Sequence, residues 1–556
     1  MLKNKNLIVL FAIFFLGSFI RFFLLSKYPI SIYWDEASIG YNAYSILHTG
    51  RDEYGVFLPI IFRAFNDYKL GGYIYLTSLA EFLFGLNYFA VRFFSAFLGS
   101  LTVILTFFIT KKLLDSSSSF KKISLLASFL AAFFLSISPW HINFSRAGFE
   151  ANAALFFVAL GFLLLLKSVF GNKKKLLFLS SFIFALSFYF YRSEFVFVPL
   201  LLLISIILFW DFVKNNLKLS IIAVLVFIIT LLPLLFSLKS EFKTDRGVKV
   251  SVVNNAFDTQ VMFARDRLQF NNIIGKIVFN NKTAIAYKTL QNYLQNFNLQ
   301  FLFFTGDPNG RQSAKGMGML YLIDAPFLIF GLYKILRSKG KAKFLILGWF
   351  LIGFIPAAIS DINPHALRGL NNVIAFEIII AIGVSSFISL FDSKIALKKT
   401  VLTAVLICYL LFFVHFIYLY FFYTPKVTAK DWGDGYRELY SYVSTQTQYK
   451  KIIISGHYWE PYIYFLFYSK YDPYLYQKSG SVFGFGKYIF GGTSWDLTNP
   501  NHTELDHLNL EKLAKTNNFL VAMSYDEYKF QKKRLIVVKN IYNISGKLMF
   551  IVARPK

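Results

Sequence analysis

The sequence predicts a polytopic α-helical membrane protein with a small α/β domain at its C-terminal end. Of the 556 residues, 56% are hydrophobic and only 16% are charged, and the mean hydropathy is +0.52. The apolar residues form many separate runs of roughly 17 to 25 residues, the length at which a helix crosses a bilayer. Short basic segments separate alternate pairs of these runs. A soluble globular protein of this size would not need so much apolar surface.

The apolar runs predict about eleven membrane-spanning helices. The first run could pass for a signal peptide, but its length, its Arg21 and the lack of a small-residue cleavage site favour a retained anchor. The expected spans are residues 7–25, 88–110, 123–139, 151–168, 176–191, 195–213, 217–238, 317–336, 342–359, 370–391 and 400–422.

The net charge is +28, from 58 Lys and Arg against 30 Asp and Glu, but its distribution argues against a nucleic-acid partner. The basic clusters all fall on one side if the spans alternate, which is the positive-inside pattern of membrane proteins. The pattern predicts a multi-pass protein of the plasma (inner) membrane, with a cytoplasmic N-terminus and an external segment after Tyr423. The expected external loops are residues 26–87, 140–150, 192–194, 239–316 and 360–369.

Hydrophobicity falls after Thr424, so we expect a transmembrane catalytic domain over residues 1–423 and an extracytoplasmic α/β domain over residues 424–556. Within the long loop 239–316, apolar residues at helical spacing predict a helix over residues 283–304, which would lie on the membrane surface or cap the bundle. In the tail we expect helices at 436–447, 460–468 and 508–516, and strands at 451–455, 519–524, 534–538 and 548–552.

Several chemistries are disfavoured by what the sequence lacks. The one cysteine, Cys408, lies in an apolar run, so no disulfide framework or thiol-based metal site is expected. The chain has neither a GxxxxGK[ST] loop nor a GxGxxG motif after a strand, which argues against a reaction driven by ATP or a dinucleotide.

The polar residues that could carry chemistry lie in the expected external loops. The stretch from Tyr33 to Tyr75 contains two pairs, Asp35 with Glu36 and Asp67 with Lys69. Charged groups close to a bilayer are costly and often mark a site, although a solvated loop explains each residue taken singly. The other candidates are His141, Arg146, Glu150, Arg192, His365 and Arg368.

A carboxylate beside a lysine at a membrane surface suits one kind of group transfer. The carboxylate can act as general base toward an acceptor hydroxyl. A lysine or arginine can hold a phosphate and stabilise the charge that grows on a departing phosphate oxygen. These are the parts needed to transfer a sugar from a polyprenyl-phosphate carrier. A nucleotide-sugar donor fits less well, because it is cytoplasmic whereas these groups are expected outside.

Four segments carry a resemblance to a known family. They read WDEASIGYNAYSIL, then FNDYKLGGYIYLTSLAEFLFGLNYFAVRFFSAFLGSLTV, then SPWHINFSRAGFEAN and finally DINPHALRGLNN. In this order the chain resembles the PMT/ArnT-like branch of the GT-C glycosyltransferases, family 39, which includes the dolichyl-phosphate-mannose protein mannosyltransferases. Each motif is short, but the resemblance extends over nearly the whole chain, and it implies a GT-C fold.

The resemblance also implies roles for three residues. Asp35 matches the catalytic carboxylate that activates the acceptor, and Glu36 would orient neighbouring groups or a divalent metal. Lys69 falls where the aminoarabinose transferases have a lysine that contacts the carrier phosphate. This sequence departs from the pattern after Lys69, because Leu70-Gly71-Gly72 stands where prolines are usual. Glycine leaves free the backbone that proline would fix, which puts the rigidity of Lys69 in question.

The remaining candidates have two interpretations each. Arg146, Arg192 and Arg368 could bind the donor phosphate or a lipid head group, or they could be interface arginines. His141 and His365 could hold a divalent metal with Asp35 or Glu36, or they could cap backbone and pack. Glu150 is expected to pair with Arg146 one helical turn away.

Together these observations predict a membrane glycosyltransferase. It would move one sugar from a polyprenyl-phosphate donor to a lipid, glycan or protein hydroxyl with inversion at the anomeric carbon. One alternative is a transporter or flippase of lipid-linked sugars, which would need charged or broken helices at the midplane of the membrane. The other is an oligosaccharyltransferase or ligase, which takes a larger donor.

Overall fold

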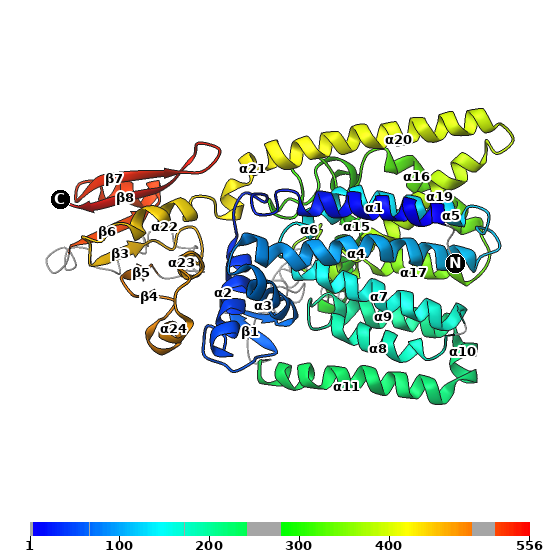
Figure 1. Ribbon diagram of the computed structural model, residues 1–556, viewed down its shortest axis with the longest axis horizontal. Helices are drawn as coiled ribbons and strands as arrows, with labels where there is room; N and C mark the ends of the chain where they lie inside the picture. Colours follow the sequence, from blue (N-terminus) through cyan, green and yellow to red (C-terminus); the bar gives the residue numbers. More distant parts are fainter. Residues whose placement is uncertain (1–3, 66, 172, 242–279, 492–517) are drawn as a thin grey trace. The chain divides into compact units, whose positions relative to one another are not determined.

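The computed structural model describes residues 4–65, 67–171, 173–241, 280–491 and 518–556 (Figure 1). The chain divides into two compact units. Unit 1 comprises Met1–Phe23 and Ser95–Leu419, and unit 2 comprises Leu24–Phe94 and Tyr420–Lys556. The segment between the first two apolar runs therefore belongs with the C-terminal residues. The expected domain boundary at residues 423 and 424 stays a prediction.

Unit 1 is built of helices whose apolar length suits a bilayer. Within the described residues, seven helices are long and apolar enough to cross a membrane, or eight if a pair bent by 55° is one span. The expected count of eleven is not confirmed. Counting the shorter ones as well, the described α-helices of unit 1 are α1 (Asn4–Phe22), the main part of α4 (Tyr88–Asp115), α5 (Ser124–Ile137), α6 (Pro139–Ser145), α7 (Glu150–Phe170), α8 (Leu176–Ser187), α9 (Glu194–Leu208), α10 (Trp210–Asn215), α11 (Leu217–Glu241), α15 (Asn281–Gln295), α16 (Asp324–Arg337), α17 (Lys341–Ile352), α18 (Ile355–Ala358), α19 (Asn372–Ser389) and α20 (Ile395–Tyr418).

Close helix packing in unit 1 depends on small residues. A Cβ atom added at Gly331 of α16 would lie 2.1 Å from the carbonyl oxygen of Ile379 in α19, and one added at Gly383 of α19 would lie 2.0 Å from that of Phe327. Only glycine permits this approach of two backbones. In a bilayer no hydrophobic effect drives helices together, so close packing at small residues helps them to associate. The two helices thereby form a tightly packed pair (Figure 1).

The first segment of unit 2 is more regular than the sequence suggested. The stretch expected as a loop contains a helix, α2 (Trp34–Thr49), a hairpin of β1 (Ile61–Ala64) and β2 (Asp67–Leu70), and a second helix, α3 (Gly72–Phe84). Helix α2 has Asp35 and Glu36 in its first turn, where acids favour a helix dipole, and it ends at Gly50 with a φ of 66°.

The C-terminal part of unit 2 forms a six-stranded sheet in the order β4-β5-β3-β6-β8-β7. Strand β3 is parallel to both β5 and β6, whereas β8 is antiparallel to β6 and β7. The bounds are β3 (Lys451–Ile454), β4 (Gly484–Phe485), β5 (Tyr488–Phe490), β6 (Phe519–Met523), β7 (Leu535–Tyr542) and β8 (Leu548–Pro555), with helices α21 (Thr424–Val427), α22 (Tyr436–Ser444), α23 (Pro461–Ser469), α24 (Pro473–Ser479) and α26 (Tyr525–Gln531).

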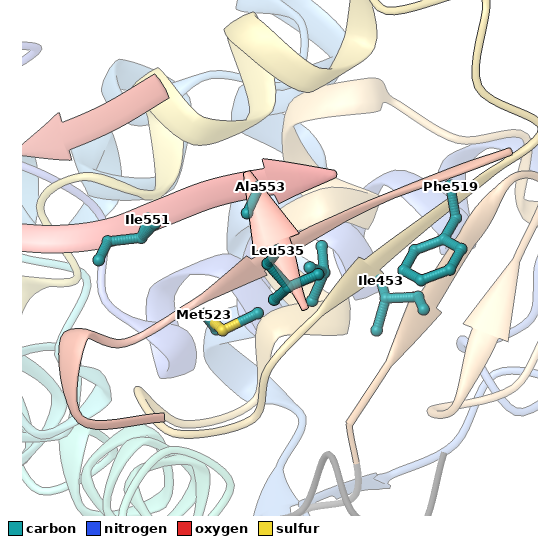
Figure 2. Packing of buried hydrophobic residues seen from close by; sticks show 7 residues of the cluster. Ile453, Phe519, Met523, Leu535, Ile551 and Ala553 are labelled. Atoms are coloured by element: carbon teal, nitrogen blue, oxygen red, sulfur yellow. The ribbon is translucent and has the colours of Figure 1, made fainter. Parts of the chain in front are cut away.

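Figure 2 shows the buried cluster that holds this sheet together. The register aligns Ile453 with Val521 and Val521 with Ala553, so alternate residues of three strands point to one face. Phe519, Met523 and the other apolar members of the cluster complete it. The expected strands of the tail are confirmed to within a few residues, although β7 continues to Tyr542. The helix expected at 508–516 lies outside the described residues.

The segment from α15 to α16 differs from what the sequence predicted. The helix expected at 283–304 is broken, because α15 ends at Gln295 and a π-helical turn covers Gln300–Phe304. Where a span was expected from residue 317, helix α16 begins only at Asp324 and is not among the seven candidate spans. In the preceding segment, Met319 and Leu320 donate backbone hydrogen bonds to Phe301 and Leu302.

Candidate active site

The centre of the candidate site in unit 2 is an ion pair. Nζ of Lys69 lies 2.6 Å from Oδ1 of Asp35, and the two side chains are 11% and 30% exposed. Asp35 sits in the first turn of α2 and Lys69 in β2, opposite Phe62 of β1. The Lys69 ammonium also lies 5.0 Å from the ring centre of Phe65. The structure thus joins the acid and the base that the sequence placed at opposite ends of one stretch.

Lys69 is positioned without the usual prolines. The β1–β2 hairpin fixes its backbone through cross-strand pairing, and the amide of Gly71 donates to the carbonyl of Ile60 at 2.9 Å. A Cβ atom at Gly71 would lie 2.7 Å from the Phe62 ring. Glycine is therefore required here by close packing, and the hairpin supplies the restraint on the backbone that was in question.

Glu36 is fully engaged by Arg92. Its two carboxylate oxygens accept hydrogen bonds of 2.9 Å each from Nε and Nη2 of Arg92, and both side chains are inaccessible to solvent. Arg92 also donates to the carbonyls of Leu25, Pro29 and Ser31. A bidentate, buried pair of this kind holds the start of α2 and the preceding chain in one arrangement, which orients Asp35.

Asp67 shares a strand face with Lys69. It begins β2 opposite Ala64, and residues two apart in a strand point to the same side. Asp67 is half-buried. The hairpin therefore presents the Asp67 carboxylate and the Lys69 ammonium on the same face.

Glu53 is a buried acid that the sequence analysis did not single out. Its Oε1 accepts from Nδ2 of Asn42 at 3.1 Å, and its amide donates to Oδ1 of Asn42 at 3.0 Å. Burial raises the pKa of Glu53 to about 8, opposed by the Asn42 hydrogen bond and by the nearby Lys69. Its one signal in the sequence is that Asp52 and Glu53 are adjacent acids in the segment between α2 and β1.

In unit 1, His141 and Arg146 are bound to the end of α1. Nη2 of Arg21 lies 2.6 Å from Nδ1 of His141. Arg146 donates to the carbonyls of Ile20, Arg21 and Phe23, the last carbonyl groups of that helix and the residue after it. Both side chains are fully buried. A guanidinium that satisfies helix-end carbonyls is a C-terminal cap.

A second cluster in unit 1 gathers Arg368, Tyr191, Glu150 and His365. The Arg368 guanidinium is hydrogen-bonded to the Tyr191 phenol, and Glu150 is close enough to affect its ionisation. Burial raises the pKa of Tyr191 to about 12, an effect that Arg368 opposes and Glu150 reinforces. Burial, and then Arg368, lowers the pKa of His365 to about 3, so this imidazole is neutral. Arg192 is exposed.

The loop that carries His365 and Arg368 is fixed by Asn296 and by Asp307 of the segment 306–316. Oδ2 of Asp307 accepts from the amide of Ala366 at 2.7 Å, and the amide of His365 donates to Oδ1 of Asn296 at 3.0 Å. Lys315 in turn donates to the carbonyl of Asp307 at 2.6 Å. Residues 306–316, which follow the π-helical turn, therefore organise a second loop.

The residues considered for a metal have other partners. Both oxygens of Glu36 accept from Arg92, and Nδ1 of His141 faces Arg21. Among the described residues, no group of three or more His, Cys, Asp or Glu side chains is arranged to hold a metal ion. Within the part of the chain that the structure describes, these residues therefore do not form a metal site by themselves.

Comparison with known proteins places this architecture in one fold. Residues 11–245 match the family model described as Dolichyl-phosphate-mannose-protein mannosyltransferase, which confirms the resemblance carried by the first three motifs. No curated protein matches the chain.

Solved structures match over nearly the full length. The chain aligns with apo ArnT from Cupriavidus metallidurans at 10% identity and a TM-score of 0.55, covering 99% of this chain and 98% of that one. ArnT bound to undecaprenyl phosphate gives 11% identity, 99% and 97% coverage and a TM-score of 0.52. The oligosaccharyltransferase AglB from Archaeoglobus fulgidus, in complex with an inhibitory peptide and a dolichol-phosphate, gives 12% identity, 99% and 74% coverage and a TM-score of 0.54. The expected GT-C fold is confirmed.

Proposed function

We propose that this protein is an integral membrane glycosyltransferase that moves one sugar from a polyprenyl-phosphate donor to an acceptor hydroxyl. The observation that carries the proposal is the Asp35–Lys69 pair, a general base and a phosphate-binding cation 2.6 Å apart in a chain with this fold. The family match over residues 11–245 and the polyprenyl phosphates bound to ArnT and AglB support the donor class.

In the proposed reaction Lys69 exchanges its partner, from the Asp35 carboxylate to the donor phosphate. A phosphate oxygen of the donor takes the place of Asp35 beside Lys69, which frees the carboxylate. Asp35 then accepts the proton of the acceptor hydroxyl as that oxygen attacks the anomeric carbon. The bond from the anomeric carbon to phosphate oxygen breaks on the opposite face, so configuration inverts. Lys69 stabilises the negative charge of the departing polyprenyl phosphate, which is larger in the transition state than in the donor.

The other charged candidates take supporting roles in the proposal. Glu36 and Arg92 hold the first turn of α2 and thereby orient Asp35. Arg368, held by Tyr191, is the arginine best prepared to bind an anion in unit 1, since Arg146 is occupied by the end of α1. Arg192 stays a prediction for the donor phosphate. The positive-inside pattern supports a cytoplasmic N-terminus, an external C-terminal domain and a location in the plasma membrane.

An oligosaccharide donor is the second candidate. AglB, an oligosaccharyltransferase, shares the fold over 99% of this chain, so the same carboxylate and lysine could serve a larger lipid-linked sugar. The one-sugar donor and the oligosaccharide donor differ in the size of the glycan and share the lipid phosphate that Lys69 would bind.

Label transfer tests the proposal and separates it from transport. Purified protein is incubated with radiolabelled polyprenyl-phosphate sugars and cell-envelope extract. We expect label to enter a new glycosidic product, and Asp35→Asn to abolish this while leaving the protein folded. Asp211→Asn, which neutralises an exposed acid in α10, is the matched control. An active Asp35→Asn variant, or movement of labelled lipid across vesicles without new bonds, would contradict the proposal.

A further inference from the structure

Two tryptophans stack beside the candidate base. The indole rings of Trp34 and Trp459 have centres 6.0 Å apart and planes inclined by 27°. Trp34 is half-buried and directly precedes Asp35, while Trp459 is 38% exposed at the end of the loop between β3 and α23. Both belong to unit 2. The C-terminal sheet thus contributes an exposed aromatic surface next to the first turn of α2.

The backbone that presents Trp459 is strained. Trp459 has a φ of 66° and Glu460 a φ of 43°, a region that residues with a Cβ seldom adopt. Consecutive outliers persist only when their surroundings hold them, and they concentrate at functional sites. Here the hydroxyl of Tyr436 donates to the carbonyls of Tyr458 and Trp459 at 3.3 and 3.4 Å. Tyr436 is itself buried and stacked on Tyr464, with ring centres 4.1 Å apart.

The topology of the sheet points to the same loop. Strands β3 and β6 are parallel neighbours, and the chain leaves β3 toward β5 on one side and β6 toward β8 and β7 on the other. Open α/β sheets bind ligands outside the carboxyl ends of the strands at such a reversal of direction. The segment Ser455–Glu460, which follows β3, lies at this edge.

We propose that Trp34 and Trp459 form a binding surface for a sugar ring of the acceptor, which is therefore a glycan. The inference rests on the proposed function, and it names the acceptor class for the same site. One face of a pyranose ring carries C–H groups whose hydrogens have a partial positive charge. These hydrogens complement the negative face of an indole ring. A hydroxyl of a ring held there is presented toward the carboxylate that follows Trp34 in the chain.

The surroundings favour a glycan over a lipid chain. The loop beside Trp459 carries His457 and Tyr458, and the Lys430 ammonium lies 5.5 Å from the Tyr458 ring centre. Imidazole, phenol and ammonium groups can exchange hydrogen bonds with sugar hydroxyls. An alkyl chain has neither donors nor acceptors, so it would leave these hydrogen-bonding groups unused.

Binding without turnover tests the proposal. Saturation-transfer NMR is measured on the full-length protein in detergent, without donor, with maltotetraose, chitotetraose and mannotriose as probes. We expect saturation of ring protons for at least one probe. Trp459→Ala should weaken that binding roughly tenfold, the loss of one aromatic contact, and Trp459→Phe should weaken it less. Trp210→Ala, which removes an exposed tryptophan of unit 1, should bind like the wild type.

The outcomes separate this inference from the proposed function. Failure of all three probes to bind, equal binding by Trp459→Ala, or competition by a Ser/Thr peptide for the same resonances would overturn the glycan surface. Label transfer from the donor to a lipid or peptide, unaffected by Trp459→Ala, would overturn it while leaving the transferase intact. Oligosaccharide binding in a protein that transfers no label would support the surface and count against the proposed reaction alone.

Discussion

Glu36 and Arg92 lie 56 residues apart in the chain and form a bidentate pair from which solvent is excluded. Within unit 2, the pair ties α2 to the first residues of α4 and to the carbonyls of the intervening chain, so the direction of Asp35 depends on it. Two neighbouring acids, Asp35 and Glu36, thus have different surroundings: one is partly exposed beside Lys69, and the other is sealed against an arginine.

Loss of one partner of the Glu36–Arg92 pair should destabilise the protein strongly. Arg92→Met leaves a buried carboxylate without its counter-ion, which costs about 3–5 kcal/mol, whereas Glu36→Gln combined with Arg92→Met should recover part of this loss. Thermal unfolding in detergent measures both. Lys122→Met is the control, because it breaks a pair with Asp392 in which the lysine is 80% exposed. Equal melting temperatures for Arg92→Met and Lys122→Met would disprove the structural role.

Lys69→Met should reduce transfer much more than stability. The pair with Asp35 is partly exposed, so its contribution to folding is at most about 1 kcal/mol. Removing a cation that stabilises a developing phosphate charge should lower kcat about 10²- to 10³-fold. Lys69→Arg keeps the charge and should retain part of the rate. Lys111→Met, which opens an exposed pair with Asp115, is the matched control. A wild-type kcat for Lys69→Met would exclude the phosphate role.

The helical membrane class was predictable because long apolar runs are typical of spans, whereas the number of spans was not, since seven or eight described helices have the length and composition where eleven were expected. The tail strands were predictable for a similar reason, since short β-branched runs such as Lys451–Ile454 are bounded by polar turns. Helix α2 was missed because it has no apolar stripe: Glu36, Ser38 and Asn42 are buried along with its apolar residues. Periodicity cannot reveal a helix that is enclosed on most sides.

The site was predictable only in part. Acids and a lysine at the two ends of one stretch suggested that Asp35 and Lys69 meet, and the structure shows that they do. The contacts of Glu53 with Asn42 and of Trp459 with Trp34 depend on tertiary folding. The first needs the chain to turn back at Gly50, and the second needs a left-handed backbone in a residue that seldom adopts it.

Asp307 should determine the order of the loop that carries His365 and Arg368. Its carboxylate accepts hydrogen bonds from the backbone amides of Asn309 and Ala366. Asp307→Ala therefore leaves two donors without partners, which costs about 1–3 kcal/mol for each donor that is buried. We expect faster hydrogen exchange across residues 363–371, measured by mass spectrometry. Thr305→Ala, which removes a single exposed hydroxyl contact to Gln300, is the control and should leave that exchange unchanged. Equal exchange in both variants would contradict the role of Asp307.

Glu53 should make stability depend on pH in a direction opposite to that of most paired acids. Burial raises its pKa from 4.5 to about 8 in the folded protein, so between these values the folded state holds a proton that the unfolded state has lost. Stability should therefore fall as pH rises from about 5 to 8, by at most roughly 1.4 kcal/mol per pH unit from this group, and then level off. Asp52, Glu460 and Lys69 also act on Glu53, so the comparison needed is between variants. Glu53→Gln should flatten the pH dependence of the melting temperature over this window, whereas Glu438→Gln, in the first turn of α22, should keep the wild-type slope. A Glu53→Gln profile parallel to that of the wild type would show that the carboxyl is ionised at neutral pH and that its contact with Asn42 is between a charged and a neutral group.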